Sequence, residues 1–284
     1  MTNFSYSPEN IKQLLPERKE NSNKGSCGRV LIIGGSPCMS GAPYFSAKAA
    51  YRTGCGLVEI FSHEDNRVIL QTLIPEAILS TWNENIDFNK LETSIQKADA
   101  IAIGMGLSTS EAMLEVLLFT LEKSECPIVI DADALNLMAK NKNLFKYIKH
   151  DAIITPHPLE MSRLSGVNVE EISNDIPTFA QKFANENKVI CVLKDHNTAV
   201  ASPDAEYIYI NQSGNSGMST GGSGDALDGI IAGLLAQGCE PYIAATLGVY
   251  IHGLAGDVAS EKLSQYSVMT TDIIDALPEI FKNI

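Results

Sequence analysis

The strongest chemical signal in the chain is a run of glycines that ends in a single carboxylate, Asp225. Five glycines lie between residues 214 and 224, and apolar residues with helical spacing follow Asp225 directly. The start of a helix carries unpaired N–H groups and a partial positive charge, and glycine lets the backbone come close to a phosphate. A lone carboxylate beside such a site is suited to take a proton from a hydroxyl. The pattern predicts a phosphoryl-transfer centre with Asp225 as its base; the alternative is a plain glycine-rich turn that Asp225 caps.

Three further polar segments are candidates for the same site. His157 lies between two prolines, which hold it in a rigid loop and favour contact with a substrate over a structural role. Lys194 ends an apolar run and begins a polar turn, and we expect it to contact a nucleotide. Asp131 and Asp133 have two open interpretations, a divalent-cation site or a helix cap formed by Asp133. The other histidines have no spacing that is typical of a metal site.

These segments follow short apolar runs that we expect to be strands of one parallel sheet. Continuous Val and Ile runs are typical of strands buried on both faces, and helical patterns alternate with them. In an open parallel sheet the carboxyl ends of the strands share one edge, where ligands bind, so the polar segments are expected to converge there. The expected strands are residues 30–33, 57–61, 100–103, 128–130, 152–154 and 189–193, and the expected helices between them are 42–52, 110–123, 133–139, 158–165 and 176–187.

The two ends of the chain and a late hairpin complete the predicted fold. A short helix at about residues 7–15 begins with Ser7 as a possible cap, and a polar connector runs on to residue 28. An antiparallel hairpin is expected at 198–201 and 207–210, and two closing helices at 241–260 and 271–281. With no repeat and no linker after residue 28, the whole chain, 1–284, is expected to form a single domain preceded by the helix and connector of residues 1–28.

Composition narrows the class of protein. Hydrophobic residues make up 45% and charged residues 19% of the chain, as in ordinary globular proteins. The net charge is −13, with no basic run, which argues against nucleic acid or an anionic membrane as a partner. The six cysteines are scattered without a C-x-x-C pair, and no signal-like or membrane-spanning apolar run occurs. These features favour a cytoplasmic protein with free thiols.

Five segments resemble, in the same order, the motifs of the ADP/ATP-dependent NAD(P)H-hydrate dehydratases, a family of the ribokinase-like superfamily. The resemblance runs from about residue 10 to residue 281. The glycine-rich segment alone indicates only the superfamily, whereas TPHPLE together with the GGS and DADALN segments is specific to the dehydratases. The segments are KGSCGRVLIIGGS (24–36), SGAP (40–43), DADALN (131–136), ITPHPLE (154–160) and GNSGMSTGGSGD (214–225).

The resemblance implies both a fold and a repair reaction. The fold would be a three-layer α/β structure with a mostly parallel central sheet, helices on both faces and a late hairpin. The reaction would be the dehydration of the S form of hydrated NADH or NADPH, driven by ADP or ATP as co-substrate. A Mg²⁺ ion would neutralise the phosphates, with no side chain identified as its ligand. The protein would be a homo-oligomer, a tetramer in the family, and would work with a separate NAD(P)H-hydrate epimerase.

The resemblance also implies roles for individual residues. Asp225 would be the catalytic residue and, together with Ala42, Gly106 and His157, would contact the hydrated dinucleotide. The adenine nucleotide would contact two short segments, which comprise Lys194, Asp195, His196, Asn197, Thr198, Gly222, Ser223 and Gly224.

Two other functions compete with this interpretation. A ribokinase-like kinase that phosphorylates an alcohol of a vitamin precursor or sugar would share the anion site and the base, and would differ in its acceptor pocket. A nucleotide-binding regulatory protein without catalysis is disfavoured, because Asp225 stands in an intact glycine-rich loop. Asp195 occupies a position where the dehydratases usually have glycine, so the preference between ADP and ATP stays open.

Overall fold

A nine-stranded sheet forms the centre of the computed structural model, which describes residue 6 and residues 8–283. The strand order is β3-β2-β1-β4-β5-β6-β7-β8-β9, with parallel pairs from β3 to β7 and antiparallel pairs at β8 and β9. The order reverses between β1 and β4, and ligands of open α/β sheets bind at such a switch point. The strands are β1 (Arg29–Ile33), β2 (Leu57–His63), β3 (Ile78–Trp82), β4 (Ala100–Ile103), β5 (Ile128–Ile130), β6 (Ala152–Ile154), β7 (Ile190–Leu193), β8 (Ala199–Ala201) and β9 (Tyr209–Ile210).

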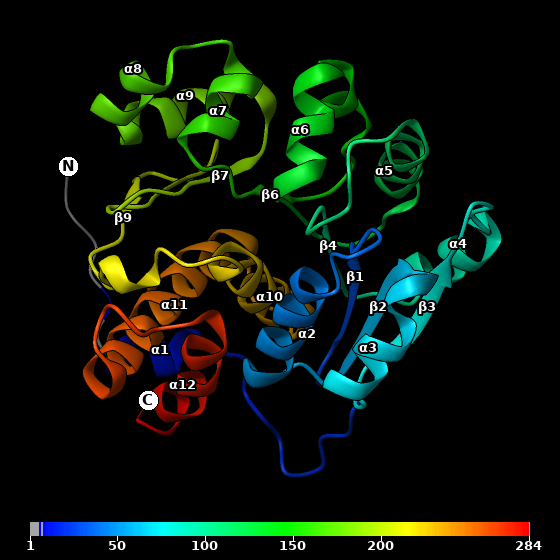
Figure 1. The fold of residues 1–284 in the computed structure, drawn as a ribbon. Helices are drawn as coiled ribbons and strands as arrows, with labels where there is room; N and C mark the ends of the chain where they lie inside the picture. The colour runs from blue at the N-terminus through cyan, green and yellow to red at the C-terminus, as the bar shows by residue number, and fades with distance from the viewer. Residues whose placement is uncertain (1–5, 7, 284) are drawn as a thin grey trace.

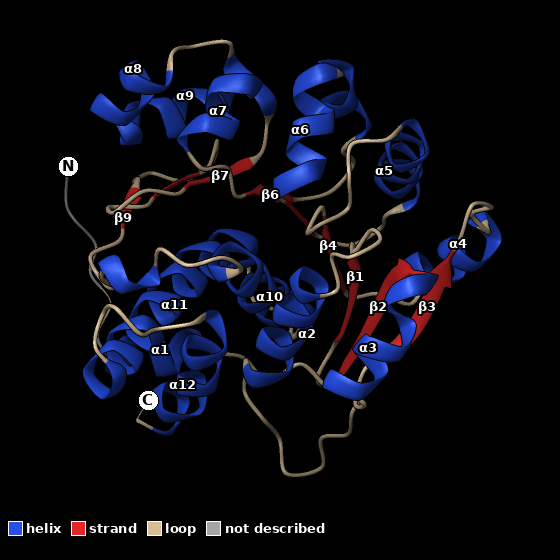
Figure 2. Cartoon of the chain, viewed as in Figure 1, coloured by secondary structure: helices blue, strands red, loops and turns tan. Residues whose placement is uncertain are grey.

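Helices cover both faces of this sheet (Figures 1 and 2). Alternate residues of a strand point to opposite faces, and in β1 Val30 and Ile32 join one core while Leu31 and Ile33 join the other. The first core is covered by α1 (Pro8–Leu14), α2 (Gly41–Arg52), α3 (Arg67–Leu73), α10 (Ser223–Ala236), α11 (Pro241–Leu263) and α12 (Thr270–Lys282). The second is covered by α4 (Phe88–Gln96), α5 (Glu111–Lys123), α6 (Ala132–Lys140), α7 (Pro158–Ser165), α8 (Val169–Asn174) and α9 (Ile176–Asn187). Three short 3-10 helices are η1 (Glu64–Asn66), η2 (Lys142–Tyr147) and η3 (Ser216–Met218).

Most of the predicted elements are confirmed. All six predicted parallel strands form, with β1 one residue longer, β2 two residues longer and β7 one residue shorter than expected, and the late hairpin is the antiparallel pair β8–β9. The sequence interpretation did not include the edge strand β3 or the helices α3, α4 and α8. The proposed cap Ser7 lies outside the described residues, although α1 itself is present. The three-layer α/β arrangement agrees with the predicted fold class.

The close packing of α10 against α2 positions the candidate base. Gly229 faces the backbone of α2, where an added Cβ would lie 2.1 Å from the Ser46 carbonyl oxygen. Ser46 in turn donates a hydrogen bond from Oγ to the Asp225 carbonyl oxygen, at 2.8 Å. Because a larger side chain at position 229 would push the helices apart, this glycine sets where the first turn of α10 lies.

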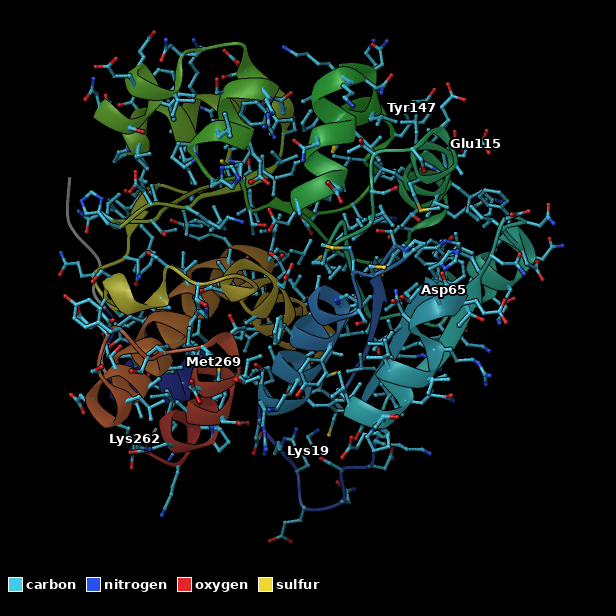
Figure 3. The ribbon with its side chains drawn as sticks, in the orientation of Figure 1. Lys19, Asp65, Glu115, Tyr147, Lys262 and Met269 are labelled. Carbon is cyan, nitrogen blue, oxygen red and sulfur yellow. The ribbon has the colours of Figure 1, made fainter. Side chains whose placement is uncertain are left out.

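Charged side chains lie mainly at the periphery of the molecule. Figure 3 labels Lys19, Glu115 and Lys262 there, and all three are exposed. Within residue 6 and residues 8–283, no helix is both long enough and apolar enough to cross a bilayer.

Candidate active site

The loops that follow the parallel strands meet at one edge of the sheet, as the sequence predicted. After β1, the Gly35 N–H donates to the Met105 carbonyl oxygen at 3.0 Å, which joins this loop to the one after β4. After β7, the Lys194 N–H donates to the Pro156 carbonyl oxygen at 2.8 Å, which joins it to the loop after β6. Segments far apart in the sequence are thereby fixed next to one another.

The glycine-rich segment leads into α10 through a left-handed residue. Gly222 has φ 91° and is the N-cap of this helix. An added Cβ at that position would lie 2.4 Å from Cδ2 of Phe45, so both the backbone angle and the space favour glycine. Within the described residues, the N–H groups of Gly224 and Asp225 donate no hydrogen bond to a side chain or to the backbone outside α10. The start of α10 therefore presents free donors, as an anion site requires.

Asp225 lies in the first turn of α10 and is held in an environment that favours its neutral form. Burial raises the pKa of its carboxyl to about 7, with the negative charges of Asp131 and Asp133 adding to this effect and Lys194 opposing it. A carboxyl group with this pKa is partly ionised at neutral pH and remains a much stronger base than an ordinary aspartate. The arrangement thus suits proton transfer.

Lys194 and Asp131 form an ion pair beside the start of α10. Lys194 Nζ donates to both oxygens of Asp131, at 2.8 and 3.0 Å. Burial opposes the charge of Lys194, but the carboxyl groups of Asp131, Asp228 and Glu160 outweigh it and raise the pKa of the lysine. An added Cβ at Gly224 would lie 3.3 Å from Nζ, so the cation sits directly next to the glycine turn.

A cavity of about 860 Å³ opens at this point. Seven of the twelve predicted site residues line it, whereas Ala42, Gly106, Asn197, Gly222 and Asp225 do not. It also includes residues that the sequence analysis did not single out as site residues, among them Asn211, Ser213 and His252. Its volume is sufficient for a ligand of nucleotide size. The predicted residues that line it are His157, Lys194, Asp195, His196, Thr198, Ser223 and Gly224.

Ala42 and Gly106 lie together near the switch point of the sheet. An added Cβ at Gly106 would lie 3.3 Å from the Cβ of Ala42 and 3.0 Å from that of Met39. Ala42 is linked to α10 through Ser46, whose Oγ is 3.3 Å from the Ala42 carbonyl oxygen and also bonds the carbonyl oxygen of Asp225. The two predicted substrate contacts are therefore neighbours, and neither is among the residues that line the cavity.

His157 is the N-cap of α7 as well as a residue of the cavity wall. Its Nδ1 accepts hydrogen bonds from the N–H groups of Leu159 and Glu160, at 3.2 and 3.3 Å. Burial, followed by the charge of Lys194, lowers the pKa of His157, so the ring is neutral at neutral pH. Because Nδ1 is an acceptor, the ring proton is on Nε2, which lies 3.4 Å from Glu160 Oε2.

The sequence profile of the NAD(P)H-hydrate dehydratase family matches residues 30–279. The chain belongs to this family. It is 41% identical over 249 residues to the ADP-dependent (S)-NAD(P)H-hydrate dehydratase of Neisseria meningitidis, covering 86% of this chain and 81% of that protein. It is 38% identical over 279 residues to the bifunctional NAD(P)H-hydrate repair enzyme of Moorella thermoacetica, covering 95% of this chain. The chain spans 52% of that relative's length.

A solved structure supports the assignment to the dehydratase family. The ADP/ATP-dependent NAD(P)H-hydrate dehydratase of Bacillus subtilis, co-crystallised with ATP and Mg²⁺, superposes with a TM-score of 0.84 at 29% identity. The match covers 97% of this chain and 96% of that one. The expected ribokinase-like fold is thereby confirmed.

Three buried groups of this dehydratase-family site were not identified as site residues from the sequence. Asp228 lies three residues after Asp225 in α10 and is fully buried, and an apolar run follows it. Glu160 accepts a bond from the His157 N–H, and burial, followed by the charge of Asp131, raises its pKa to about 7. Burial lowers the pKa of His252 to about 4, and its Nε2 lies 3.4 Å from Ser223 Oγ. In the sequence, Glu160 ends the segment ITPHPLE, and Asp228 and His252 are titratable residues among mostly apolar neighbours.

Capping of α6 by Asp133 is a wrong prediction. The helix begins at Ala132, with Asp131 as its N-cap residue and no side-chain cap bond. The Asp133 carboxylate instead accepts a hydrogen bond from the Ser108 N–H, at 2.7 Å. The left-handed conformation of Ala132, with φ 50°, turns the chain so that Asp131 faces Lys194. In the described part of the chain, no group of three or more His, Cys, Asp or Glu side chains has the geometry to hold a metal ion.

Proposed function

We propose that the protein restores hydrated NADH and NADPH, in their S form, to the working cofactors with ADP or ATP as co-substrate. The observation that carries this proposal is the placement of Asp225, whose carboxyl has a pKa of about 7, at the free N–H groups that begin α10. The neighbouring ion pair of Lys194 and Asp131 and the adjoining cavity supply the means to bind a phosphate chain. Membership of the dehydratase family supports the choice of substrate.

The nucleotide is proposed to occupy the cavity with its terminal phosphate at the start of α10. Lys194, Asp195, His196 and Thr198 border the cavity on the side of β7, and Ser223 and Gly224 border it at the start of α10. The charge of Lys194 and the free N–H groups at positions 224 and 225 stabilise the negative charge that spreads over the transferring phosphoryl group.

In the first step the C6 hydroxyl of the hydrated nicotinamide attacks the terminal phosphorus. The new O–P bond forms as the bond between that phosphorus and the nucleotide's bridging oxygen breaks, and Asp225 takes the hydroxyl proton. In the second step the C6–O bond breaks and phosphate leaves with the bonding electron pair. Loss of a proton from the neighbouring ring carbon then restores the C5–C6 double bond.

The hydrated ring is proposed to lie between Asp225 and the pair formed by Ala42 and Gly106. Glycine at position 106, with φ 60°, keeps the space above Ala42 open, because an added Cβ would approach both Ala42 and Met39. His157 is proposed to donate its Nε2–H to the dinucleotide from the opposite wall. This arrangement would present the C6 hydroxyl to the base.

Mg²⁺ is proposed to accompany the nucleotide rather than to bind a protein cage. Mg²⁺ is commonly held by substrate phosphates and waters with few protein ligands. The described residues fit that mode, because they contain no cluster of metal-binding side chains and Asp131 is occupied by Lys194. When bound, the ion supplies charge neutralisation for the phosphates.

The proposed setting is the cytoplasm, where the protein acts as a homo-oligomer together with an NAD(P)H-hydrate epimerase. All six cysteines are free, which is consistent with a reducing compartment. The bifunctional repair enzymes among the relatives support a second activity that acts on the same metabolite.

The decisive experiment is a repair assay with hydrated NADH, ADP or ATP, and Mg²⁺. Return of the dihydronicotinamide absorbance is expected only when the nucleotide is present. A matched control uses Asp225→Asn, which keeps the size of the side chain and removes the base. A stable phosphorylated product without recovery of the absorbance would instead identify a small-molecule kinase.

A further inference from the structure

Asp228 is a fully buried carboxyl group for which the proposed reaction has no use. It lies three residues after Asp225 on α10, and its side chain is 0% exposed. Oδ1 accepts a hydrogen bond from Thr155 Oγ1 at 2.8 Å. Oδ2 accepts no hydrogen bond from any of the described residues. An ionised carboxylate left unpaired in this way would be costly, so the group needs either a donor or a proton of its own.

The groups that face Asp228 decide between these two possibilities. Its charged and titratable neighbours are Asp131, Lys194 and Asp225. Lys194 donates two hydrogen bonds to Asp131. Of the two carboxyl groups, Asp131 and Asp228, Asp131 is therefore the ionised one. Two carboxyl groups form a hydrogen bond with each other only when one of them carries a proton. Burial, followed by the negative charge of Asp131, raises the pKa of Asp228 well above its ordinary value.

We propose that Asp228 is a positioning residue, a neutral carboxylic acid whose Oδ2–H donates a hydrogen bond to Asp131 and thereby fixes the carboxylate that holds Lys194 beside Gly224. The net charge of the trio formed by Asp131, Asp228 and Lys194 is then zero. If Asp228 were ionised, the trio would carry one negative charge and repel the phosphates of a nucleotide. This inference rests on the proposed function in one respect, that Lys194 contacts the nucleotide.

The protonation state is open to a direct measurement that needs no nucleotide. Infrared difference spectra between the wild-type protein and Asp228→Asn at pH 8.5 are expected to show the carbonyl stretch of a protonated carboxylic acid. Asp225 and Glu160 have pKa values of about 7 and are mostly ionised at that pH, so they do not contribute. Absence of the band in the wild-type protein at pH 8.5 would overturn the proposal.

The positioning role is tested by calorimetric binding of ADP with Mg²⁺ to matched variants. Asp228→Asn keeps both a donor toward Asp131 and an acceptor for Thr155, so its affinity is expected to equal that of the wild type from pH 6 to pH 8. Asp228→Leu keeps the branched shape of the side chain but is larger and loses the donor, and its affinity is expected to fall about tenfold. Thr155→Val, which frees Oδ1 without adding or removing charge, is expected to show a smaller loss and replaces the Leu variant if that one does not fold.

Two binding results would refute the positioning role. Markedly tighter binding by Asp228→Asn would mean that a negative charge had been removed, and wild-type affinity in Asp228→Leu and Thr155→Val would mean that nothing is positioned. The outcome of the repair assay is independent of these measurements. If the infrared band and the affinity pattern are found in a protein without dehydratase activity, the proposed function is wrong and the role of Asp228 stands.

Discussion

Replacing Asp225 by Asn is expected to stop turnover while nucleotide binding persists. The amide keeps the size of the side chain and the start of α10, but it cannot take a proton from the attacking hydroxyl. A positioned general base contributes about 100- to 10,000-fold to the rate, so kcat/KM should fall by at least about 100-fold. Nucleotide affinity should not weaken, because the free N–H groups and Lys194 are unchanged.

The pKa of Asp225 gives this prediction a pH dependence. A carboxyl with a pKa of about 7 is about one-tenth ionised at pH 6 and about nine-tenths ionised at pH 8. Only the ionised form acts as a base, and kcat/KM reports the free enzyme. The wild-type kcat/KM should therefore rise about tenfold between pH 6 and pH 8 and level off above that range.

A second variant tests the physical cause of that midpoint. The negative charge of Asp133 is one of the causes that raise the pKa of Asp225, so Asp133→Asn should move the midpoint to lower pH. The Asn side-chain oxygen can still accept the hydrogen bond from the Ser108 N–H. The measurement is the recovery of dihydronicotinamide absorbance, followed continuously at each pH.

Two results would show that Asp225 is not the base. One is a wild-type kcat/KM that does not change with pH, and the other is an Asp225→Asn variant whose kcat/KM is within tenfold of wild type.

Three further substitutions probe the surroundings of the site. His157→Ala should weaken the binding of hydrated NADH more than that of ADP, and equal losses by calorimetry would count against substrate contact. Gly222→Ala should lower both Tm and turnover, because a side chain is disfavoured at φ 91° and its Cβ would lie 2.4 Å from Phe45; an unchanged Tm would contradict this reasoning. Glu160 has a folded pKa of about 7 against an ordinary 4.5, so the wild type loses stability as pH rises through this window. Glu160→Gln should show a smaller fall in Tm from pH 5 to pH 8, and identical curves would refute the shift.

The elements that the sequence analysis found and missed differ in how they are buried. The strands β1 and β4 lie under helices on both faces, so their continuous apolar runs stood out. β3 is at the edge of the sheet and begins with Ile78, which is 41% exposed, so its pattern is mixed. α3 carries Val68, Ile69 and Leu73 on its exposed side, which hides the helical period of its buried face.

The candidate site was predictable as a meeting of loops but not as a set of contacts. A parallel sheet brings the carboxyl ends of its strands together whatever the side chains are, so the convergence followed from the strand pattern. The pair of Lys194 and Asp131 joins residues 63 positions apart that directly follow β7 and β5, two strands with β6 between them. Whether Asp131 faces Lys194 depends on the left-handed turn at Ala132, an unusual conformation for alanine that no sequence pattern indicates.

The acidic character of the site has a consequence for nucleotide binding. Asp131, Asp225 and Glu160 surround a single Lys194, and a phosphate chain brings further negative charge into the same region. Added negative charge favours the protonated form of a neighbouring carboxyl, so binding should raise the pKa values of Asp225 and Glu160 beyond about 7. Nucleotide binding at pH 7.5 is therefore expected to take up protons.

Proton uptake is measured by calorimetry in buffers with different heats of ionisation. The observed heat of ADP binding should vary with the buffer, and the slope of that variation gives the number of protons taken up. Asp225→Asn and Glu160→Gln should each reduce the slope, which apportions the uptake between the two groups. Binding heats that are the same in every buffer would mean that the phosphates do not enter the acidic region, and the phosphate position proposed at the start of α10 would then be wrong.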